Sequence, residues 1–203
     1  MKKLFIFAIL AAIFCSCATN GYVVFRYDMK QVEKREKQEI VFDNPTSNHE
    51  YRDENISFRF YFDTINNPSK ILVDIHNNFN ETVLIRKSLI QFILADGYCV
   101  NTLSKDDKDG GTYNLLRKSK TKFYVEKERD YYNTIPTNYY QSYYSTTYNY
   151  KDFTREVVFT SKDFNNIKSI YVDKTFTIYI PIVLPNGNTK EYYFIFSVIP
   201  YKI

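Results

Sequence analysis

The chain contains no tryptophan and has only two histidines, three cysteines and five glycines among its 203 residues. His49 and His76 have no partner at the spacing of a metal-binding motif such as His-x-x-x-His, and there is no Gly-x-Ser-x-Gly motif to present a catalytic serine. We interpret His76 as a polar residue beside a turn rather than as a ligand or a base. The lack of tryptophan and of clustered acidic pairs also argues against a glycosidase. The sequence therefore predicts a protein that is not an enzyme and holds no metal or cofactor.

An acidic stretch near the middle of the chain has part of the pattern of a calcium-binding loop. Asp107, Asp109 and Gly110 fall at its third, fifth and sixth positions. Lys105 and Leu116 take the first and twelfth positions, where a carboxylate is needed. We interpret the stretch as an acidic turn that ends in glycine.

The chain begins with a short apolar run behind a positively charged head. Two lysines precede the apolar residues 4–14, which are followed by Cys15, Ser16 and Cys17. This order predicts a secretory signal peptide, residues 1–16. The run is shorter than the roughly 20 apolar residues that a permanent membrane helix needs.

The end of this segment resembles a bacterial lipobox, in which an apolar stretch and a small residue precede a cysteine. The resemblance implies that Cys17 carries a thioether-linked diacylglycerol and an N-acyl chain such as palmitate after residues 1–16 are removed. Several acyl chains anchor a protein stably to a membrane, whereas one chain holds it only marginally. The alternative is an ordinary cleaved signal followed by an incidental cysteine.

Cys99 would then be the one cysteine left with a free thiol, because Cys15 leaves with the signal and Cys17 is acylated. No intramolecular disulfide is possible in that case. Cys99 lies in a predicted strand with no histidine or basic residue next to it. We therefore interpret it as a buried structural thiol, not a nucleophile.

The charges of the chain nearly balance. There are 27 basic and 23 acidic side chains, and loss of the two lysines of the signal leaves 25 against 23, a net charge of +2. This near neutrality gives no electrostatic case for binding nucleic acid or anionic lipid. The expected partners are the membrane, through the lipid anchor, and an envelope protein or glycan.

The rest of the chain is rich in strand-forming residues, including 20 tyrosines and 17 phenylalanines. Apolar and polar residues alternate over 56–63 and 176–183, as in antiparallel strands with one wet face. Asn186-Gly187, between the second of these and an apolar run, predicts a hairpin. Pro181 lacks an amide proton, so its strand is expected at an edge or bulged there. Short strands at spacings of roughly 8–12 residues predict an all-β fold, an immunoglobulin-like antiparallel β-sandwich.

Three parts of the chain are predicted: residues 1–16, the signal peptide; residues 17–52, a lipidated tether and an irregular N-terminal segment; and residues 53–203, the β-sandwich domain with a Tyr-rich insertion at 126–152. The charged stretch 30–39 contains a single apolar residue, which favours a mobile loop. One helical turn is expected at 161–166, and no longer amphipathic helix.

The chain resembles a family of uncharacterised lipoproteins from Bacteroidetes-type bacteria. The residues that carry the resemblance are Cys17, the Tyr22-Val-Val-Phe25 start, Ile71-Leu-Val-Asp-Ile-His-Asn-Asn78, Val83-Leu-Ile85 and Leu89-Ile-Gln-Phe-Ile-Leu-Ala-Asp-Gly97. They cover about the first half of the mature chain. The resemblance implies an extracytoplasmic β-domain and supplies no activity.

These observations predict a membrane-anchored, extracytoplasmic lipoprotein of the cell envelope, at the outer membrane, that acts as a non-catalytic binding module. One alternative is a structural or accessory subunit of an envelope assembly, with an exposed C-terminal strand offered for β-augmentation. A second alternative is a hydrolase whose residues converge only in three dimensions.

The Tyr-rich insertion has eight of the twenty tyrosines between Tyr131 and Tyr150, joined mainly by Asn, Ser and Thr. Tyrosine offers a large rigid contact area with a hydroxyl group, and Ser and Asn add adaptable hydrogen bonds. We hypothesise that the insertion binds a partner through four of these rings: Tyr139, Tyr140, Tyr143 and Tyr144. The alternative is passive packing on the sandwich.

Replacing these four tyrosines together with serine is expected to leave the melting temperature unchanged and to abolish partner capture, because a binding loop contributes contact area but no core. Thermal unfolding and a pull-down would measure the two effects. A large drop in melting temperature would show that the rings belong to the core.

Overall fold

The computed structural model describes residues 21–63, 70–93, 97, 99–103, 111–127, 156–158 and 161–202. These residues are mostly antiparallel β-strands, with one α-helix, α2 (Ser161–Tyr171), and a 3-10 turn at Lys87–Leu89. The all-β prediction is confirmed. The strands are β1 (Gly21–Glu36), β2 (Glu39–Asp43), β3 (Glu50–Arg52), β4 (Ile56–Phe62), β5 (Lys70–Asn77), β6 (Val83–Arg86), β7 (Gln91–Ile93), β8 (Cys99–Leu103), β9 (Thr112–Leu115), β10 (Lys120–Lys127), β11 (Glu156–Val158), β12 (Thr175–Val183) and β13 (Thr189–Lys202).

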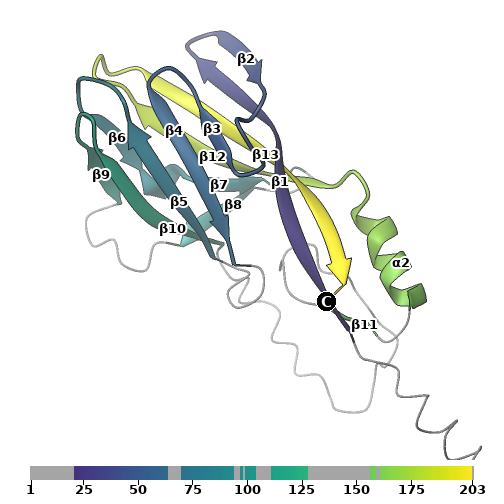
Figure 1. Cartoon of the computed structure of the whole chain (residues 1–203). Helices are drawn as coiled ribbons and strands as arrows, with labels where there is room; N and C mark the ends of the chain where they lie inside the picture. The colour runs from purple at the N-terminus through teal and green to yellow at the C-terminus, as the bar shows by residue number, and fades with distance from the viewer. Residues whose placement is uncertain are drawn as a thin grey trace, which may run out of the picture.

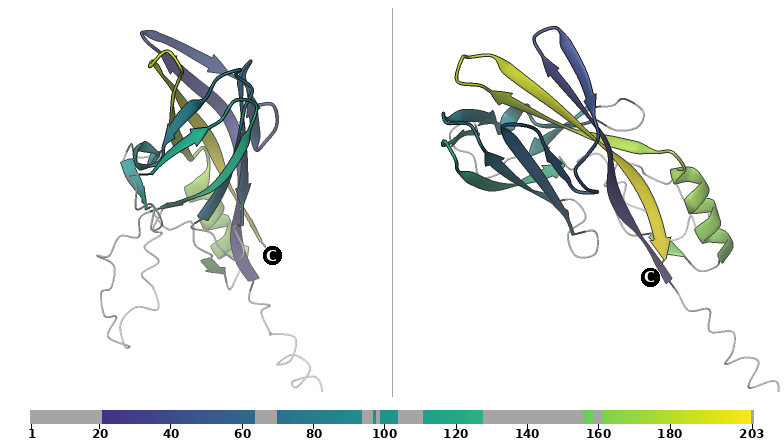
Figure 2. Two further views of the ribbon diagram at one scale, coloured as in Figure 1. Left: turned by 90° about the vertical axis from the view of Figure 1, so that its left-hand side faces the viewer. Right: turned by 45° about the horizontal axis from the view of Figure 1, so that its top comes forward.

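The strands pair in the order β11-β1-β13-β12-β7-β8-β10-β5-β4-β3, with β2 added to β1, and with β6 between β12 and β9. β8 connects two layers, because it pairs with β7 on one side and with β10 on the other. The layer of β3, β4, β5 and β10 lies against the layer that contains β12 and β13 (Figures 1 and 2). The fold is therefore β-sandwich-like.

Aromatic rings from β4 and β13 fill the space between the layers. Phe58 and Phe60 are at most 1% exposed, and Phe194 and Phe196 are fully buried. The ring centroids of Phe58 and Phe60 each lie 4.8 Å from that of Phe194. Successive side chains of a strand point to opposite faces, so the predicted alternation over 56–63 places these rings inside.

The predicted hairpin is confirmed. β12 and β13 pair from Thr175 to Val183, and Val183 lies opposite Thr189. Gly187 has a φ of +80°, a conformation that glycine adopts without strain. The amide of Asn188 donates a hydrogen bond to Oδ1 of Asn186, 3.0 Å away.

Pro181 lies in an internal strand, not at the predicted edge. β12 pairs with β13 along its length, and on its other side with β7 at Thr177–Tyr179 and with β6 at Ile182–Val183. Pro181 thus falls between these two segments, and on that side no register pair includes it. The C-terminal strand β13 is likewise paired on both sides, with β1 and β12, so the expected exposed strand for β-augmentation is wrong.

The N-terminal segment is not irregular. Residues 21–36 form β1, which pairs with β13 from Val23 to Glu36, and the stretch predicted as a mobile loop supplies the second half of β1. The register shifts between Met29 and Gln31, so the alternation of buried Phe25, Tyr27 and Met29 does not continue to residue 31, and the next buried side chain is Val32. This bulge interrupts the period of two and hides the second half of the strand from pattern analysis.

The single helical turn expected after Ser161 is instead the 11-residue helix α2. Its Tyr171 is 6% exposed, and the ring lies 4.7 Å from that of Phe25 in β1. Tyr171 and the partly buried Phe164 both pack against the core, and these contacts stabilise the helix beyond what its polar sequence favours.

Phe194→Ala is expected to lower the free energy of unfolding by about 3–5 kcal/mol, because the cavity would lie between the two layers. Tyr201→Ala, at a ring that is 37% exposed, is the matched control and should change stability by less than about 1 kcal/mol. Urea denaturation would measure both. Equal losses for the two variants would contradict a core centred on Phe194.

Candidate functional site

The residues predicted to carry function lie outside the described part of the chain. These are the lipidation candidate Cys17, the tyrosines Tyr139, Tyr140, Tyr143 and Tyr144, and the acidic turn at 106–110. The structure therefore tests none of these predictions. Within the described ranges, no group of three His, Cys, Asp or Glu side chains is placed to hold a metal ion, and no helix is long and apolar enough to cross a bilayer.

Two residues considered in the sequence, Cys99 and His49, can be examined in the structure. Cys99 is exposed, with Sγ 3.9 Å from the carbonyl oxygen of Gly97, so the prediction of a buried thiol is wrong. Its strand β8 connects the two layers, because it pairs with β7 in one and with β10 in the other. The sequence pattern of such a strand does not show which of its side chains face the core. His49 has a structural role, because Nε2 lies 2.7 Å from the carbonyl oxygen of Tyr27.

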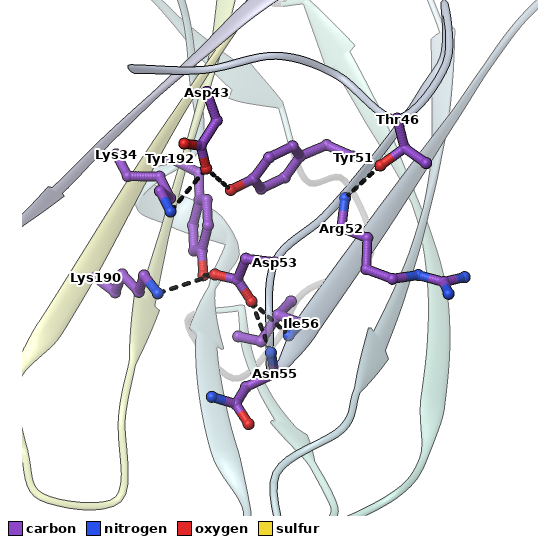
Figure 3. Close-up of polar contacts among 10 residues, drawn as sticks. All are labelled: Lys34, Asp43, Thr46, Tyr51, Arg52, Asp53, Asn55, Ile56, Lys190 and Tyr192. Atoms are coloured by element: carbon purple, nitrogen blue, oxygen red, sulfur yellow. Dashed lines mark hydrogen bonds and ion pairs between the residues drawn. The ribbon is translucent and has the colours of Figure 1, made fainter. Parts of the chain in front are cut away.

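Asp53 forms the most buried ionic contact of the described residues (Figure 3). Its side chain is 6% exposed, and Oδ2 accepts hydrogen bonds from Lys190 Nζ at 2.9 Å and from the Tyr192 hydroxyl at 2.7 Å. Oδ1 accepts the amides of Asn55 and Ile56, both at 2.8 Å, in the turn between β3 and β4. Asp53 thus joins this turn to β13.

A second carboxylate lies beside the first. Asp43 Oδ2 accepts hydrogen bonds from the Tyr51 hydroxyl at 2.6 Å and from Lys34 Nζ at 2.7 Å (Figure 3). These two donors lower the pKa of Asp43 below its ordinary value, against the opposing effect of burial. The contact ties β1 and β2 to β3.

The charge state of Asp53 follows from opposing effects. Burial raises the pKa of its carboxyl group, but Lys190 and the hydrogen bonds from Asn55, Tyr192 and Ile56 outweigh burial and lower the pKa below its ordinary value. Both oxygens already accept two hydrogen bonds each. The carboxylate is therefore ionised, and each of its oxygens already has two hydrogen-bond donors. This arrangement indicates a structural role rather than a catalytic one.

The outer face of β3, β4, β5 and β10 is open to solvent and ordered in rows. Strand register places side chains opposite one another in three rows: Tyr61, Leu72 and Tyr124; Glu50, Arg59, Asp74 and Lys122; and Arg52, Ser57, His76 and Lys120. Tyr61 and Tyr124 are 40% and 62% exposed. The residues of the three rows are called the outer face below.

Ion pairs join the middle row. Arg59 Nη2 lies 2.8 Å from Glu50 Oε2, and Lys122 Nζ lies 3.4 Å from Asp74 Oδ2. Lys122 also stands 5.8 Å from the centre of the Tyr61 ring. A shallow depression of about 90 Å³ lies over the second and third rows, lined by Glu50, Arg52, Ser57, Phe58, Arg59, Asp74, His76 and Lys120.

The outer face contains the residue types of a serine hydrolase, but not their arrangement. Ser57 lies opposite His76, and Asp74 is two residues from it on the same strand. Among the described residues, no hydrogen bond joins Ser57 to His76 or His76 to Asp74, whereas a triad requires both. The face can bind charged and aromatic groups by complementary contacts.

Sequence reasoning identified neither the Asp53 contact nor the outer face. The alternation over 56–63 shows that Ser57, Arg59 and Tyr61 share one side of a strand. It does not show which residues of other strands lie beside them. Asp53 and Lys190 are 137 residues apart, and no local pattern connects them.

Comparisons with known proteins place the chain in no family. No protein-family model matches it, and searches of curated proteins and of solved structures gave no match.

Asp53→Asn is expected to lower the free energy of unfolding at pH 7 by about 2 kcal/mol, because Lys190 would lose its ionic partner. The lowered pKa means that the wild-type contribution is present above about pH 4, the ordinary carboxyl value, and is lost as the pH falls through the folded-state pKa. Denaturation curves of the two proteins should therefore converge below pH 4.

Glu54→Gln is the matched control, since it removes the same charge from an exposed neighbour in the same turn. Its stability should follow that of the wild type at every pH. A constant difference between Asp53→Asn and wild type down to pH 2 would contradict an ionic role for Asp53.

Proposed function

We propose that the protein is a lipid-anchored, extracytoplasmic module of the cell envelope that binds a partner, without catalysis, through the outer face of β3, β4, β5 and β10. The observation that carries the proposal is the outer face itself, where exposed arginines and tyrosines are held in fixed rows by strand register. Tyr and Arg are the residue types that most often dominate binding energy at interfaces.

The exposure of the aromatic row supports a binding role. Tyr124 is 62% exposed and Tyr61 40% exposed, so these rings contribute little to the core. Their Cα positions lie on either side of Leu72 in neighbouring strands, so both rings belong to one surface. Such a surface offers a partner apolar contact area next to the charges of Arg59 and Lys122.

The sequence before β1 supports the location. Cys17 lies four residues before Gly21, where β1 begins. A lipid at Cys17 would hold this end of β1 at an outer membrane surface, in keeping with the resemblance to Bacteroidetes-type lipoproteins. The immunoglobulin-like form of the sandwich belongs to the same proposal and is supported by the two facing layers. The Tyr-rich insertion would add contact area.

A second candidate function, an accessory subunit of an envelope assembly, is favoured by β2. Among the described residues this strand pairs only with β1, and it exposes Ile40 at 54%, Val41 at 36% and Phe42 at 58%. An edge strand with exposed apolar side chains can pair with a strand of another protein.

In-cell photocrosslinking separates the two functions. A photoreactive amino acid at Tyr124 should crosslink one envelope component, and Tyr201, exposed but away from the outer face, is the control position that should give none. Crosslinks from Phe42 alone would support the accessory subunit. No crosslink from either position would contradict both functions.

Cys17→Ser tests the anchor in the same cells. Acyl chains supply nearly all the membrane affinity of a lipoprotein, so the variant should leave the detergent phase and lose the Tyr124 crosslink. An unchanged mass and unchanged membrane partitioning would show that the protein is not lipidated.

A further inference from the structure

The third row of the outer face consists of hydrogen-bond donors. Arg52 lies opposite Ser57, Ser57 opposite His76, and His76 opposite Lys120, one residue from each of four adjacent strands. Directly opposed residues have Cβ atoms about 4.5–5.5 Å apart. The four side chains line the same shallow depression.

The acidic side chains near this row already have cationic partners. Glu50 contacts Arg59 at 2.8 Å and Arg52 at the longer distance of 3.6 Å. Asp74 contacts Lys122 at 3.4 Å. Among the described residues, Lys120 has no carboxylate within ion-pair distance. Within the described part of the chain, the row thus carries the positive charges of Arg52 and Lys120, and its carboxylate contact is that of Glu50 with Arg52.

His76 reports this electrostatic environment. Its pKa lies below the ordinary value because of partial burial and then because of Lys120 and Arg52, with a further contribution from Lys118. Asp74, on the same strand, is the opposing influence. Other charged and polar groups near the imidazole ring come from three strands: Glu50 of β3, Ser57 and Arg59 of β4, and Lys122 of β10. The imidazole is therefore neutral at neutral pH, and an anion beside it would favour its protonated form.

We propose that Arg52, Ser57, His76 and Lys120 bind a single oxyanion of the phosphate class. Guanidinium, ammonium, hydroxyl and imidazole groups all donate hydrogen bonds to phosphate oxygens. A phosphate group presents more acceptor oxygens than a carboxylate, which suits four donors from four strands. The inference rests on the proposed function and gives the chemistry that the outer face recognises: a phosphate ester whose remainder extends over the second row toward Tyr61 and Tyr124.

The two histidines of the chain allow a direct test. NMR signals of the His76 and His49 rings would be followed in the full chain, in non-ionic detergent, while inorganic phosphate is added and sodium chloride at equal ionic strength serves as the control. Phosphate should shift the His76 signal and raise the pKa of His76, because a bound anion favours the protonated imidazole. His49, which contacts the Tyr27 carbonyl, should not respond.

Matched variants locate the site. Arg52→Gln and Lys120→Gln should each weaken phosphate binding by about threefold, as expected for one exposed charge contact. Lys122→Gln removes the same charge from β10 but from the middle row, where Asp74 is its partner, and should weaken binding less. Equal effects of all three substitutions would mean general screening and would overturn the site.

The source of the phosphate is tested with vesicles and the Cys17→Ser chain. Binding to vesicles that contain phosphatidic acid, but not to neutral vesicles, identifies a lipid headgroup, and a response to inorganic phosphate alone identifies a soluble ester. A His76 signal that phosphate and chloride shift equally would overturn the inference, while a Tyr124 crosslink would still support the binding module. A phosphate response without any crosslink would overturn the proposed function and keep the oxyanion site.

Discussion

The packing of β4 against β13 is the interaction on which the rest of the structure depends. Phe58 and Phe60 meet Phe194 and Phe196 between the layers. Because side chains of a strand alternate between its two faces, this packing also directs Ser57, Arg59 and Tyr61 outward. A slip of one residue would exchange the two sets. The outer face is therefore a consequence of the same register that builds the core.

The two carboxylates at the end of the layers hold this register in place. Asp53 connects the β3–β4 turn to β13, and Asp43 connects β2 to β3 and to Lys34 of β1. Buried ionic groups contribute little net stability but are costly to leave unpaired, so they disfavour alternative alignments of the strands. In this way polar contacts away from the outer face determine which side chains stand beside one another on it.

Sequence patterns identified the elements whose signals are local. The β12–β13 hairpin follows from Asn186-Gly187 between alternating runs, and β4 follows from the alternation over 56–63. Residues 22–27 have a strand-like sequence, but the second half of β1 was missed because the bulge at Lys30 breaks the period and because this charged half is stabilised by β13, which lies far away in sequence. The same reason explains the outer face: its rows depend on pairings among four strands that no single segment encodes.

The length of β1 has a mechanical consequence. β1 has 16 residues, so it spans about 50 Å, and it is held to β13 by pairs from Val23 to Glu36. If Cys17 is lipidated as proposed, tension from the membrane would enter the described structure at Gly21, the first residue of β1. The part of this force along the strand axis would act on the β1–β13 pairs. Force in that direction loads all the β1–β13 hydrogen bonds together, whereas force across the strands would open them one at a time. β1, the described strand nearest to Cys17, would therefore resist tension along its axis better than tension across it.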